Sequence, residues 1–358
     1  MKCRVCHASS VHIRTDTRVV VRECSSLARN GYEVTLVIEG NDEKKNGINI
    51  LGVGEQPTSR IKRMLFFAPK TYGIAKKVDA DIFHFHDPEM IPYAIKLKKL
   101  GKKIVYDIHE NNSEAIMDKK WMPLALRKPI SALFNLYEQK QVRKFDGIIV
   151  VTEGLKNKYE KNAKIIEVVN NYPDLSDIVF HTSNFEDRER IIGYAGNMSE
   201  LYGEKVIYQA MKGIDATLII AGGYAKTETS NIKVKGRINR AEVNELYGRS
   251  RLGIVLYQPA GNNNAAQPAK LFEYMAAGLP VVASNFPLWR ELVEKTGCGL
   301  CVNPENSDEV RKAITFLLDN PKEAQEMGKR GHEAVANNMN WNNEFAKIER
   351  MYNTIIKN

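Results

Sequence analysis

The sequence predicts an α/β fold built from two doubly wound domains with parallel sheets, and three observations support this. The chain has 358 residues, 43% hydrophobic and 27% charged, which is enough to form two separate cores. Short apolar runs alternate with helical patterns along the chain, as expected for parallel strands joined by crossover helices. This alternation stops over residues 174–190 and then resumes.

The first half contains two predicted helices and a series of predicted strands. An amphipathic helix is expected over 18–29, because Asn30-Gly31 forms a typical helix end, and another over 91–100. The apolar runs that predict strands are 5–7, 33–38, 81–84, 103–107, 147–151 and 165–169.

The second half repeats this pattern and completes the predicted domain organisation. Its expected strands are 191–195, 216–221, 232–235, 253–256, 280–283 and 299–302. We therefore predict an N-terminal domain (1–173), a linker (174–190), a C-terminal domain (191–338) and a final helix (339–358) that packs back on the first domain. Two such domains are expected to face each other across a cleft, with ligands beyond the carboxyl ends of the strands.

Several classes of protein are disfavoured by composition. No apolar run is long enough for a membrane span, and the N-terminus lacks the apolar region of a signal peptide, so a cytoplasmic location is expected. Five cysteines argue against a disulfide framework. The pair Cys3/Cys6 leaves haem attachment as an alternative, and a zinc site shared with the pair Cys298/Cys301 is another. The favoured interpretation is that most of these cysteines are small buried hydrophobic residues.

Positive charge is concentrated in the first half of the chain. The net charge is +9, and residues 1–180, with 30 basic and 22 acidic residues, carry +8 of it. Such asymmetry favours a polyanionic neighbour, namely an anionic membrane, nucleic acid or a phosphorylated substrate, over a merely solvated surface. No nucleic-acid motif accompanies the charge, so no nucleic-acid partner is expected.

Two basic stretches in this half favour the membrane surface. Residues 60–77 contain six Lys/Arg and no acid, with Ile61, Met64, Leu65 and Ala68 at helical spacing and Phe66 and Phe67 beside them. Residues 119–128 join four cations to Trp121. Cations flanking apolar and aromatic residues are typical of an interfacial segment, so peripheral attachment to the inner membrane face is expected. The alternative is that the apolar face packs on the domain core.

The loop before residue 268 predicts an anion site. A polar loop of small residues, including Ala265, Ala266 and Gln267, leads to Pro268, where a helix is expected to start. Lys270 lies in the first turn, where a cation is unfavourable unless an anion binds the helix N-terminus. Glu273 lies on the same face, so the pair could bind a nucleoside diphosphate; an ordinary surface ion pair is the alternative. Neither a Walker A string nor GxGxxG is present.

Other strand ends carry further candidates. Gly196 follows a predicted strand and would let the backbone approach a phosphate closely. His84, His86 and His109 lie at two strand ends and could suggest a metal, although the same residues also suit sugar hydroxyls. Asp79 and Asp81 spell DxD, a known metal–nucleotide clamp, but they precede a strand, so this role is disfavoured.

An ordered set of motifs resembles the GT-B glycosyltransferases of family GT4, in particular a branch that assembles bacterial polysaccharides. The resemblance covers nearly the whole chain and rests on these segments: 16–18, 23–28, 31–34, His84-Phe85-His86-Asp87-Pro88-Glu89, Tyr106-Asp107-Ile108-His109-Glu110, 169–173, 268–284 and 298–300, with Trp341.

The resemblance implies roles for individual residues. Glu273 matches the second acid of the E-x7-E signature, which binds ribose hydroxyls, and His109 matches a histidine beside the donor sugar. With Lys270 these are the expected catalytic residues. The expected donor-binding residues are Asp16, Arg18, Gly196, Asn197, Arg237, Ile238, Ala265, Ala266, Gln267 and Leu271, and those on the acceptor side are Asp87 and Glu110.

Three departures from the family pattern concern charge. The first acid of E-x7-E falls at Ala265, the phosphate-binding arginine at Asn197 and the phosphate-binding lysine at Tyr202. Lys270 and the helix dipole are inferred to stabilise the negative charge of the diphosphate in place of these residues. No metal or other cofactor is therefore expected.

The resulting expectation is a retaining transferase that moves a sugar from a nucleotide-sugar, expected to be a UDP-sugar, to a polysaccharide or lipid-linked acceptor. Two alternatives stay open. One is a non-catalytic nucleotide-sugar-binding subunit of a transferase complex, and the other is a sugar-nucleotide epimerase.

Overall fold

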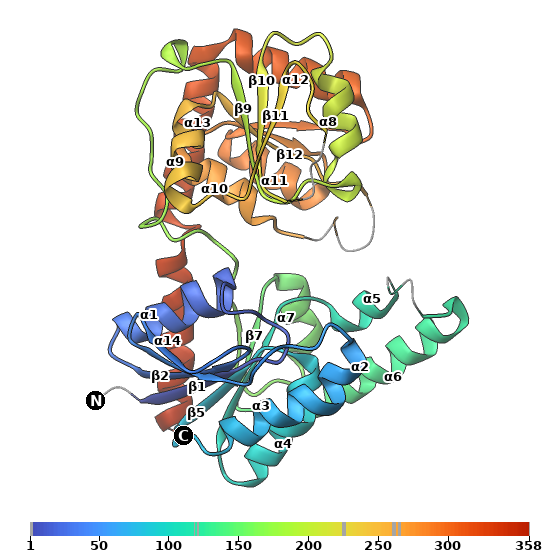
Figure 1. Ribbon diagram of the computed structural model, residues 1–358, viewed down its shortest axis with the longest axis vertical. Coiled ribbons are helices and arrows are strands. Elements are labelled where there is room, and N and C mark those ends of the chain that lie inside the picture. Colours follow the sequence, from blue (N-terminus) through green and yellow to red (C-terminus); the bar gives the residue numbers. More distant parts are fainter. Residues whose placement is uncertain are drawn as a thin grey trace. The chain divides into compact units, whose positions relative to one another are not determined.

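The computed structural model describes residues 3–117, 119, 122–223, 227–259, 263 and 266–357. It divides into two compact units, residues 1–170 with 344–358, and residues 171–343. Both are α/β units whose sheets are mainly parallel, close to the prediction (Figure 1).

The described part of the first unit contains an eight-stranded sheet in the order β3-β4-β2-β1-β5-β6-β7-β8. All pairs are parallel except β3 with β4. The strands are β1 (Arg4–Ala8), β2 (Glu33–Ile38), β3 (Glu43–Lys45), β4 (Ile48–Gly52), β5 (Ile82–Phe85), β6 (Lys103–Ile108), β7 (Gly147–Val150) and β8 (Ile166–Val168).

Helices cover both faces of this sheet. They are the π-helix η1 (Thr17–Cys24), α1 (Ser25–Arg29), α2 (Arg60–Lys62), the π-helix η2 (Arg63–Phe67), α3 (Ala68–Ala75), the 3₁₀-helix η3 (Pro88–Met90), α4 (Ile91–Lys99), α5 (Asn112–Met117), α6 (Leu124–Val142) and α7 (Glu153–Tyr159). Alternation along the strands divides their side chains between the faces. Cys6, Phe83 and Tyr106 join the core beneath α3, α4, α6 and α7, so His7, His84 and Asp107 point to the opposite face.

The second unit has a six-stranded parallel sheet among its described residues, in the order β11-β10-β9-β12-β13-β14. Its strands are β9 (Ile191–Ala195), β10 (Thr217–Ala221), β11 (Ile232–Gly236), β12 (Leu252–Val255), β13 (Val281–Ser284) and β14 (Gly299–Val302). Its helices are the 3₁₀-helices η4 (Phe185–Asp187) and η5 (Glu200–Tyr202), then α8 (Glu204–Met211), α9 (Arg240–Arg249), α10 (Ala269–Ala277), α11 (Pro287–Thr296), α12 (Ser307–Asp319) and α13 (Pro321–Asn337).

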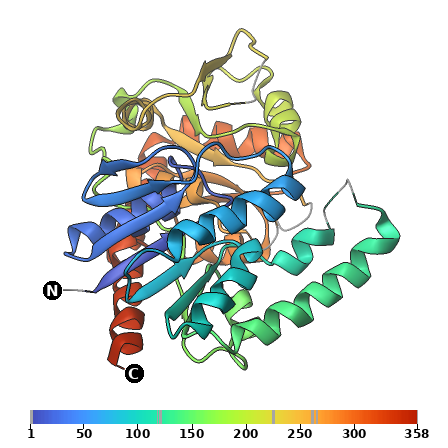
Figure 2. The ribbon, with the colours of Figure 1, turned by 60° about the horizontal axis from the view of Figure 1, so that its bottom comes forward.

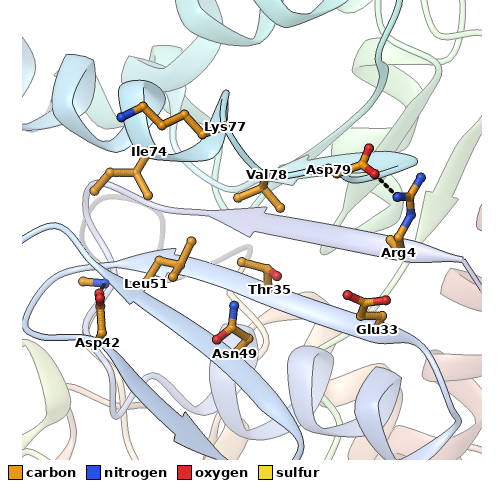
Figure 3. A pocket seen from close by; sticks show the side chains of 11 residues that line it. Arg4, Glu33, Thr35, Asp42, Asn49, Leu51, Ile74, Lys77, Val78 and Asp79 are labelled. Carbon is orange, nitrogen blue, oxygen red and sulfur yellow. Dashed lines mark hydrogen bonds and ion pairs between the residues drawn. The ribbon is translucent and has the colours of Figure 1, made fainter.

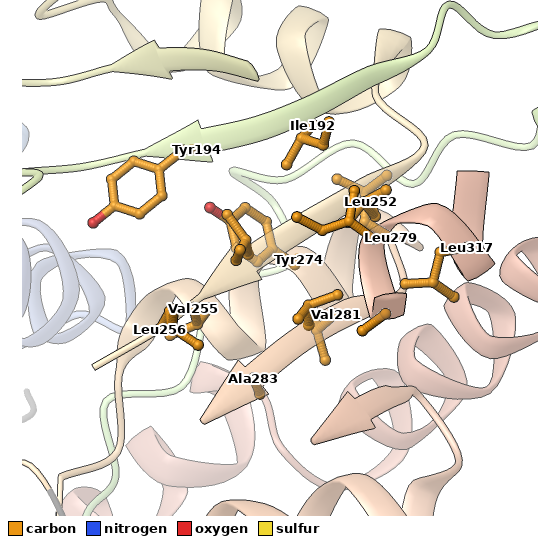
Figure 4. Close-up of a cluster of buried hydrophobic side chains, with 14 of the residues drawn as sticks. Ile192, Tyr194, Leu252, Val255, Leu256, Tyr274, Leu279, Val281, Ala283 and Leu317 are labelled. Carbon is orange, nitrogen blue, oxygen red and sulfur yellow. The ribbon is translucent and has the colours of Figure 1, made fainter. Parts of the chain in front are cut away.

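Apolar side chains from these elements form a continuous core in the second unit (Figure 4). Leu252 and Val281 on neighbouring strands are fully buried, and so is Tyr274 of α10. A Cβ on Gly253 would lie 2.5 Å from the Tyr274 ring, so glycine is required where α10 crosses β12. The core therefore fixes α10, the helix that carries Lys270 and Glu273, against the sheet.

Two segments differ from the predicted boundaries. Residues 174–190, expected as a linker, belong to the second unit because Ile178 and Phe185 enter its core. The final helix is α14 (Trp341–Lys357), and residues 344–358 belong to the first unit. There Tyr352 is fully buried, and its hydroxyl contacts His84 of β5. The expected helix over 18–29 is split between η1 and α1.

Candidate functional site

The strand order of the second sheet reverses between β9 and β12, and ligands of doubly wound sheets bind beyond the carboxyl ends of the strands at such a point. Gly196 follows β9 with φ 131°, a backbone angle that favours glycine. A Cβ there would lie 2.8 Å from Nζ of Lys270. The structure thus brings together Gly196, which the sequence placed after a strand, and Lys270, which it placed in the first turn of a helix.

Lys270 is enclosed by aromatic rings. Its Nζ lies 5.1 Å from the ring centroid of Tyr194, 5.5 Å from that of Tyr202 and 5.8 Å from that of Tyr257. No carboxylate in the described part of the chain forms an ion pair with it. Burial, opposed by the charge of Glu273, lowers the pKa of Lys270 to about 8. A cation held in this way stabilises an anion more than a solvated one does, because its own hydration is already lost.

Glu273 lies one turn further along α10 and is held by two partners. The Arg240 guanidinium approaches Oε1 at 3.2 Å and Oε2 at 3.4 Å, and the Tyr247 hydroxyl donates to Oε2 at 3.2 Å. Tyr247 is fully buried and the Glu273 side chain is 13% exposed. The carboxylate is therefore oriented in advance and keeps accepting capacity for a ligand hydroxyl.

The other predicted residues of this unit lie around the same edge. Asn197 is exposed, and its carbonyl oxygen accepts from the Tyr194 hydroxyl at 2.8 Å. The carbonyl of Ala266 accepts from Trp289 Nε1 at 2.7 Å. Gln267 Oε1 is buried and accepts no hydrogen bond from a described residue. Leu271 is buried in the core and its N–H donates to Pro268.

Three further residues of the second unit were predicted to bind the donor. Arg237 follows β11 and is exposed. Ile238 packs against the small cluster that contains Ile219. Ala265 lies outside the described residues.

The first sheet reverses its strand order between β1 and β5, and polar residues gather there too. Asp87 follows β5 and is buried. It accepts from the Ser9 hydroxyl at 2.9 Å and the Ser10 N–H at 2.6 Å. Glu89 accepts from Arg63 Nε at 2.9 Å and from the Ser10 hydroxyl at 2.8 Å. These contacts fix the loop after β1 against the end of β5.

His109 lies at the rim of this polar group. Its Nε2 is 3.2 Å from Oδ2 of the fully buried Asp107 and 3.3 Å from Nδ1 of His86. Burial opposes ionisation of Asp107, but the Arg18 guanidinium and the neighbouring imidazoles hold the pKa of its carboxyl well below its usual range. Asp107 remains an anion that orients His109.

Arg18 and Asp16 support this arrangement from η1. Arg18 is 6% exposed and donates to both oxygens of Asp107 at 3.1 Å and to the Val169 carbonyl at 2.9 Å, so its guanidinium lies inside the unit. Asp16 caps η1, because its side chain accepts from the N–H groups of Arg18 and Val19. Its other oxygen lies 2.8 Å from Nδ1 of His12.

A cavity of about 500 Å³ opens beside these groups within the first unit. Its polar lining includes His86, Asp87, Glu89, His109 and the exposed Glu110, together with the cations Arg60, Arg63 and Lys119, and the rest of the lining is largely apolar. The apolar lining comes from η2, α5 and α6 and comprises Met64, Ala115, Ile116, Ile130 and Phe134, with Met122 before α6. The cavity suits a molecule that combines hydroxyl groups with an apolar portion.

The opposite edge of the first sheet carries the DxD residues. A cavity of about 640 Å³ there is lined by Arg4, Glu33 and Asp79 (Figure 3). The Arg4 guanidinium forms ion pairs with both Asp79 and Asp81. Both carboxylates are thus paired with the single Arg4 guanidinium, on the side of the sheet away from His109.

Several site residues were not predicted from the sequence. Arg240 and Tyr247 on α9 hold Glu273, and His7 and Tyr352 adjoin His86 and His84. A polar residue in an apolar strand, as His7 is in β1, is the one available signal; Arg240 and Tyr247 resemble ordinary residues of a surface helix.

Two family models match the chain in sequence. Residues 17–177 match Glycosyltransferase Family 4, and residues 176–334 match Glycosyl transferases group 1. An uncharacterized glycosyltransferase of Methanocaldococcus jannaschii is 24% identical over 344 residues, which cover 82% of each protein.

Solved structures share the fold of the entire chain. Sucrose-phosphate synthase from Thermosynechococcus elongatus has a TM-score of 0.77 at 15% identity, covering 99% of this chain and 100% of that one. Anabaena HepE in complex with UDP-glucose has a TM-score of 0.73 at 13% identity, covering 98% and 100%.

Proposed function

The chain belongs to the GT4-type glycosyltransferases with the GT-B fold, and we propose that it is a retaining enzyme that transfers a sugar from a UDP-sugar to a lipid-linked or polysaccharide acceptor. The observation that supports this most directly is the pairing of Lys270 and Glu273 on one face of α10 beside Gly196. Lys270 would supply the cation for a diphosphate, and Glu273 would supply the carboxylate for the ribose hydroxyls.

The diphosphate is proposed to bind between Gly196 and the N-terminus of α10. Lys270 Nζ would contact the phosphate oxygens, and the free N–H groups of the helix would add further donors. Departure of the sugar leaves negative charge on this diphosphate, so fixed donors lower the barrier without a metal. Tyr202 occupies the position of the family's usual lysine, and its ring helps to confine Lys270 instead.

The ribose hydroxyls are proposed to donate to Glu273. Arg240 and Tyr247 restrict the rotamers of this carboxylate, so little side-chain entropy is lost on binding. The bound UDP-glucose in HepE, a protein of the same fold, supports a UDP-sugar donor.

The acceptor is proposed to enter the cavity of the first unit, with its hydroxyl near His109 and its apolar portion along α6. In the proposed front-face route the leaving phosphate takes the acceptor proton. His109, oriented by Asp107, would align the reacting sugar.

Incubating the protein with UDP-sugars and lipid extracts tests this function. A sugar transferred to lipid with retained anomeric configuration is the expected product. A changed sugar without acceptor would identify an epimerase, and binding without turnover would identify a non-catalytic subunit; either result would overturn the proposal.

Donor binding is expected to weaken at alkaline pH. The depressed pKa of Lys270, about 8, means that the free enzyme loses this positive charge as the pH rises, whereas bound phosphate favours the charged amine. UDP affinity should therefore be level near pH 7 and fall by up to about tenfold per pH unit above pH 8. Calorimetric titrations across this range measure the effect. Lys270→Met should show a flat profile, and a flat profile for the wild type would contradict the prediction.

Chelation is expected to leave transfer unchanged. EDTA added to the assay should not alter the initial rate, because the proposed donor site uses Lys270 and helix N–H groups rather than a metal. Initial rates with EDTA, with EDTA plus excess Mn²⁺ and with neither measure this. Inactivation that Mn²⁺ reverses would show that a metal holds the diphosphate.

Peripheral membrane attachment is proposed through the first unit. No helix among the described residues is long and apolar enough to cross a bilayer. Phe67 and Ala68 are buried, whereas Ile61, Met64, Leu65 and Phe66 are 48–69% exposed. Leu124, Leu133 and Leu136 on α6, which runs along the outer edge of the unit in Figure 2, are 67–76% exposed. The exposed Arg60 and Lys62 lie beside the first group.

Anionic vesicles are expected to bind the wild-type protein at low salt and release it at high salt. Arg60→Glu with Lys62→Glu should weaken binding at least about 30-fold, since each cation near the surface contributes about 1 kcal/mol. Arg63 is left unchanged because it pairs with Glu89. Lys312→Glu with Lys329→Glu, both exposed on the second unit, is the matched control. Vesicle flotation measures binding; a wild type that stays unbound at low salt would make a soluble acceptor the better choice.

A further inference from the structure

Four metal-ligating side chains converge on the face of the first sheet that α14 covers. They are His7 of β1, Glu23 of η1, His84 of β5 and His86 just after it, and all four side chains are 0–3% exposed. His7 and His84 are direct partners in the parallel register of β1 and β5. Strand pairing therefore brings together residues that lie far apart in the sequence.

The spacing of their ligand atoms suits one metal ion. One ligand atom from each residue lies within 4.8 Å of one from every other. His7 Nδ1 is 3.0 Å from His86 Nε2, and Glu23 Oε2 is 3.9 Å from each of these nitrogens. With zinc–ligand bonds of about 2.0–2.2 Å, ligands at tetrahedral angles lie about 3.4 Å apart. The distances of 3.0 and 3.9 Å lie on either side of that value.

Two of these groups lack hydrogen-bond partners. Both carboxylate oxygens of Glu23 and Nε2 of His84 are buried and accept no hydrogen bond from a described residue. The Arg18 guanidinium approaches Oε1 at 3.0 Å, whereas the described groups printed nearest to Oε2 are the His7 and His86 nitrogens at 3.9 Å, beyond hydrogen-bond distance. Such atoms are costly in a protein interior and indicate a missing partner.

The remaining nitrogens of the three histidines already have partners. His84 Nδ1 lies 2.7 Å and His7 Nε2 3.3 Å from the Tyr352 hydroxyl oxygen. His86 Nδ1 lies 3.6 Å from Oδ2 of Asp107. Histidines that bind a metal nearly always direct their other nitrogen to such a group, which fixes the ring orientation.

We propose that His7, Glu23, His84 and His86 bind one divalent transition-metal ion, with Zn²⁺ the best match to three imidazoles and a carboxylate. Arg18 and Asp107 neutralise each other, so Glu23 supplies one negative charge to the ion. The ion would join β1, η1 and β5 and hold His86 against His109. It takes no part in binding the diphosphate, and its burial would prevent EDTA from removing it during an assay. The inference is independent of the proposed function.

Metal analysis of the purified, untagged full-length protein tests the proposal. After dialysis against EDTA, the protein is expected to retain about one Zn²⁺ per chain, measured by inductively coupled plasma mass spectrometry. Glu23→Gln and His84→Ala should each lose it, and His332→Ala, on α13 of the second unit, should retain it. A folded wild-type protein with less than a tenth of an equivalent of any transition metal would overturn the proposal, as would full occupancy in folded His84→Ala.

Reconstitution covers the case in which these variants do not fold. Protein stripped of metal in denaturant and refolded with Co²⁺ should show the visible absorption of tetrahedral Co²⁺ with nitrogen and oxygen ligands, and a raised melting temperature. A near-ultraviolet thiolate-to-cobalt band would place the ion on cysteines. The absence of any visible band in refolded protein would indicate a metal-free cluster with a proton on Glu23; both results would overturn the proposal.

Discussion

Replacing Lys270 with alanine is expected to lower kcat/KM by about 100- to 1,000-fold, the usual effect of removing one fixed donor that stabilises developing charge. Lys270 is the cation enclosed by Tyr194, Tyr202 and Tyr257, and the family's other phosphate cations are replaced by Asn197 and Tyr202. No second side chain at this edge is proposed to replace it. Steady-state kinetics with a UDP-sugar donor measure the loss.

Two further variants separate charge from packing. Lys270→Met retains most of the side-chain volume between the tyrosine rings but has no charge, so it should lose as much activity as Lys270→Ala while folding normally. Lys322→Ala, at an 88% exposed position of the same unit, should retain wild-type activity. Activity of Lys270→Met within about threefold of wild type would show that other groups stabilise the diphosphate.

Glu273→Ala is expected to weaken UDP binding by about 10- to 100-fold, because a hydrogen bond to a charged group contributes about 1.5–3 kcal/mol. The loss should appear in calorimetric titration of UDP and should be much smaller for a ligand without ribose, such as pyrophosphate. Unchanged UDP affinity would remove Glu273 from the donor site.

Folding has to be controlled in this experiment, because Glu273→Ala also deprives the buried Tyr247 hydroxyl of its acceptor. Tyr247→Phe removes that hydroxyl but leaves the carboxylate paired with Arg240. It should lower the melting temperature with little loss of affinity. Glu333→Ala, exposed on α13, should change neither quantity.

The strands were largely predictable from the sequence, because each fully buried parallel strand requires a short apolar run. The observed bounds of β2 and β14 match the predicted ranges. The strands β3 and β4 were missed. Residues of β3 are all exposed and charged, and its turn depends on Asn46, with φ 51°, so β3 has no apolar pattern of its own. In β4 the buried Ile48 and Ile50 do alternate with less buried residues, but the strand is only five residues long.

Helix type and the local environment of side chains were less predictable. The amphipathic pattern after residue 17 correctly indicated a helix, but not the π-helix η1, in which Arg18, Val20 and Glu23 are all buried. The apolar residues of 60–68 looked like one face, yet Phe67 and Ala68 enter the core while Phe66 is 69% exposed. Packing against neighbouring elements decides such cases.

Sequence alone determined the α/β class, the presence of two domains and the motif positions of Lys270, Glu273 and His109, since these depend on local periodicity and on residue order. Only the tertiary structure decided which side chains meet. His7 joins His84 and Tyr352 because of strand register and the return of α14 to the first unit. Arg240 reaches Glu273 because α9 packs beside α10. Such contacts depend on long-range packing, which no local pattern of residues encodes.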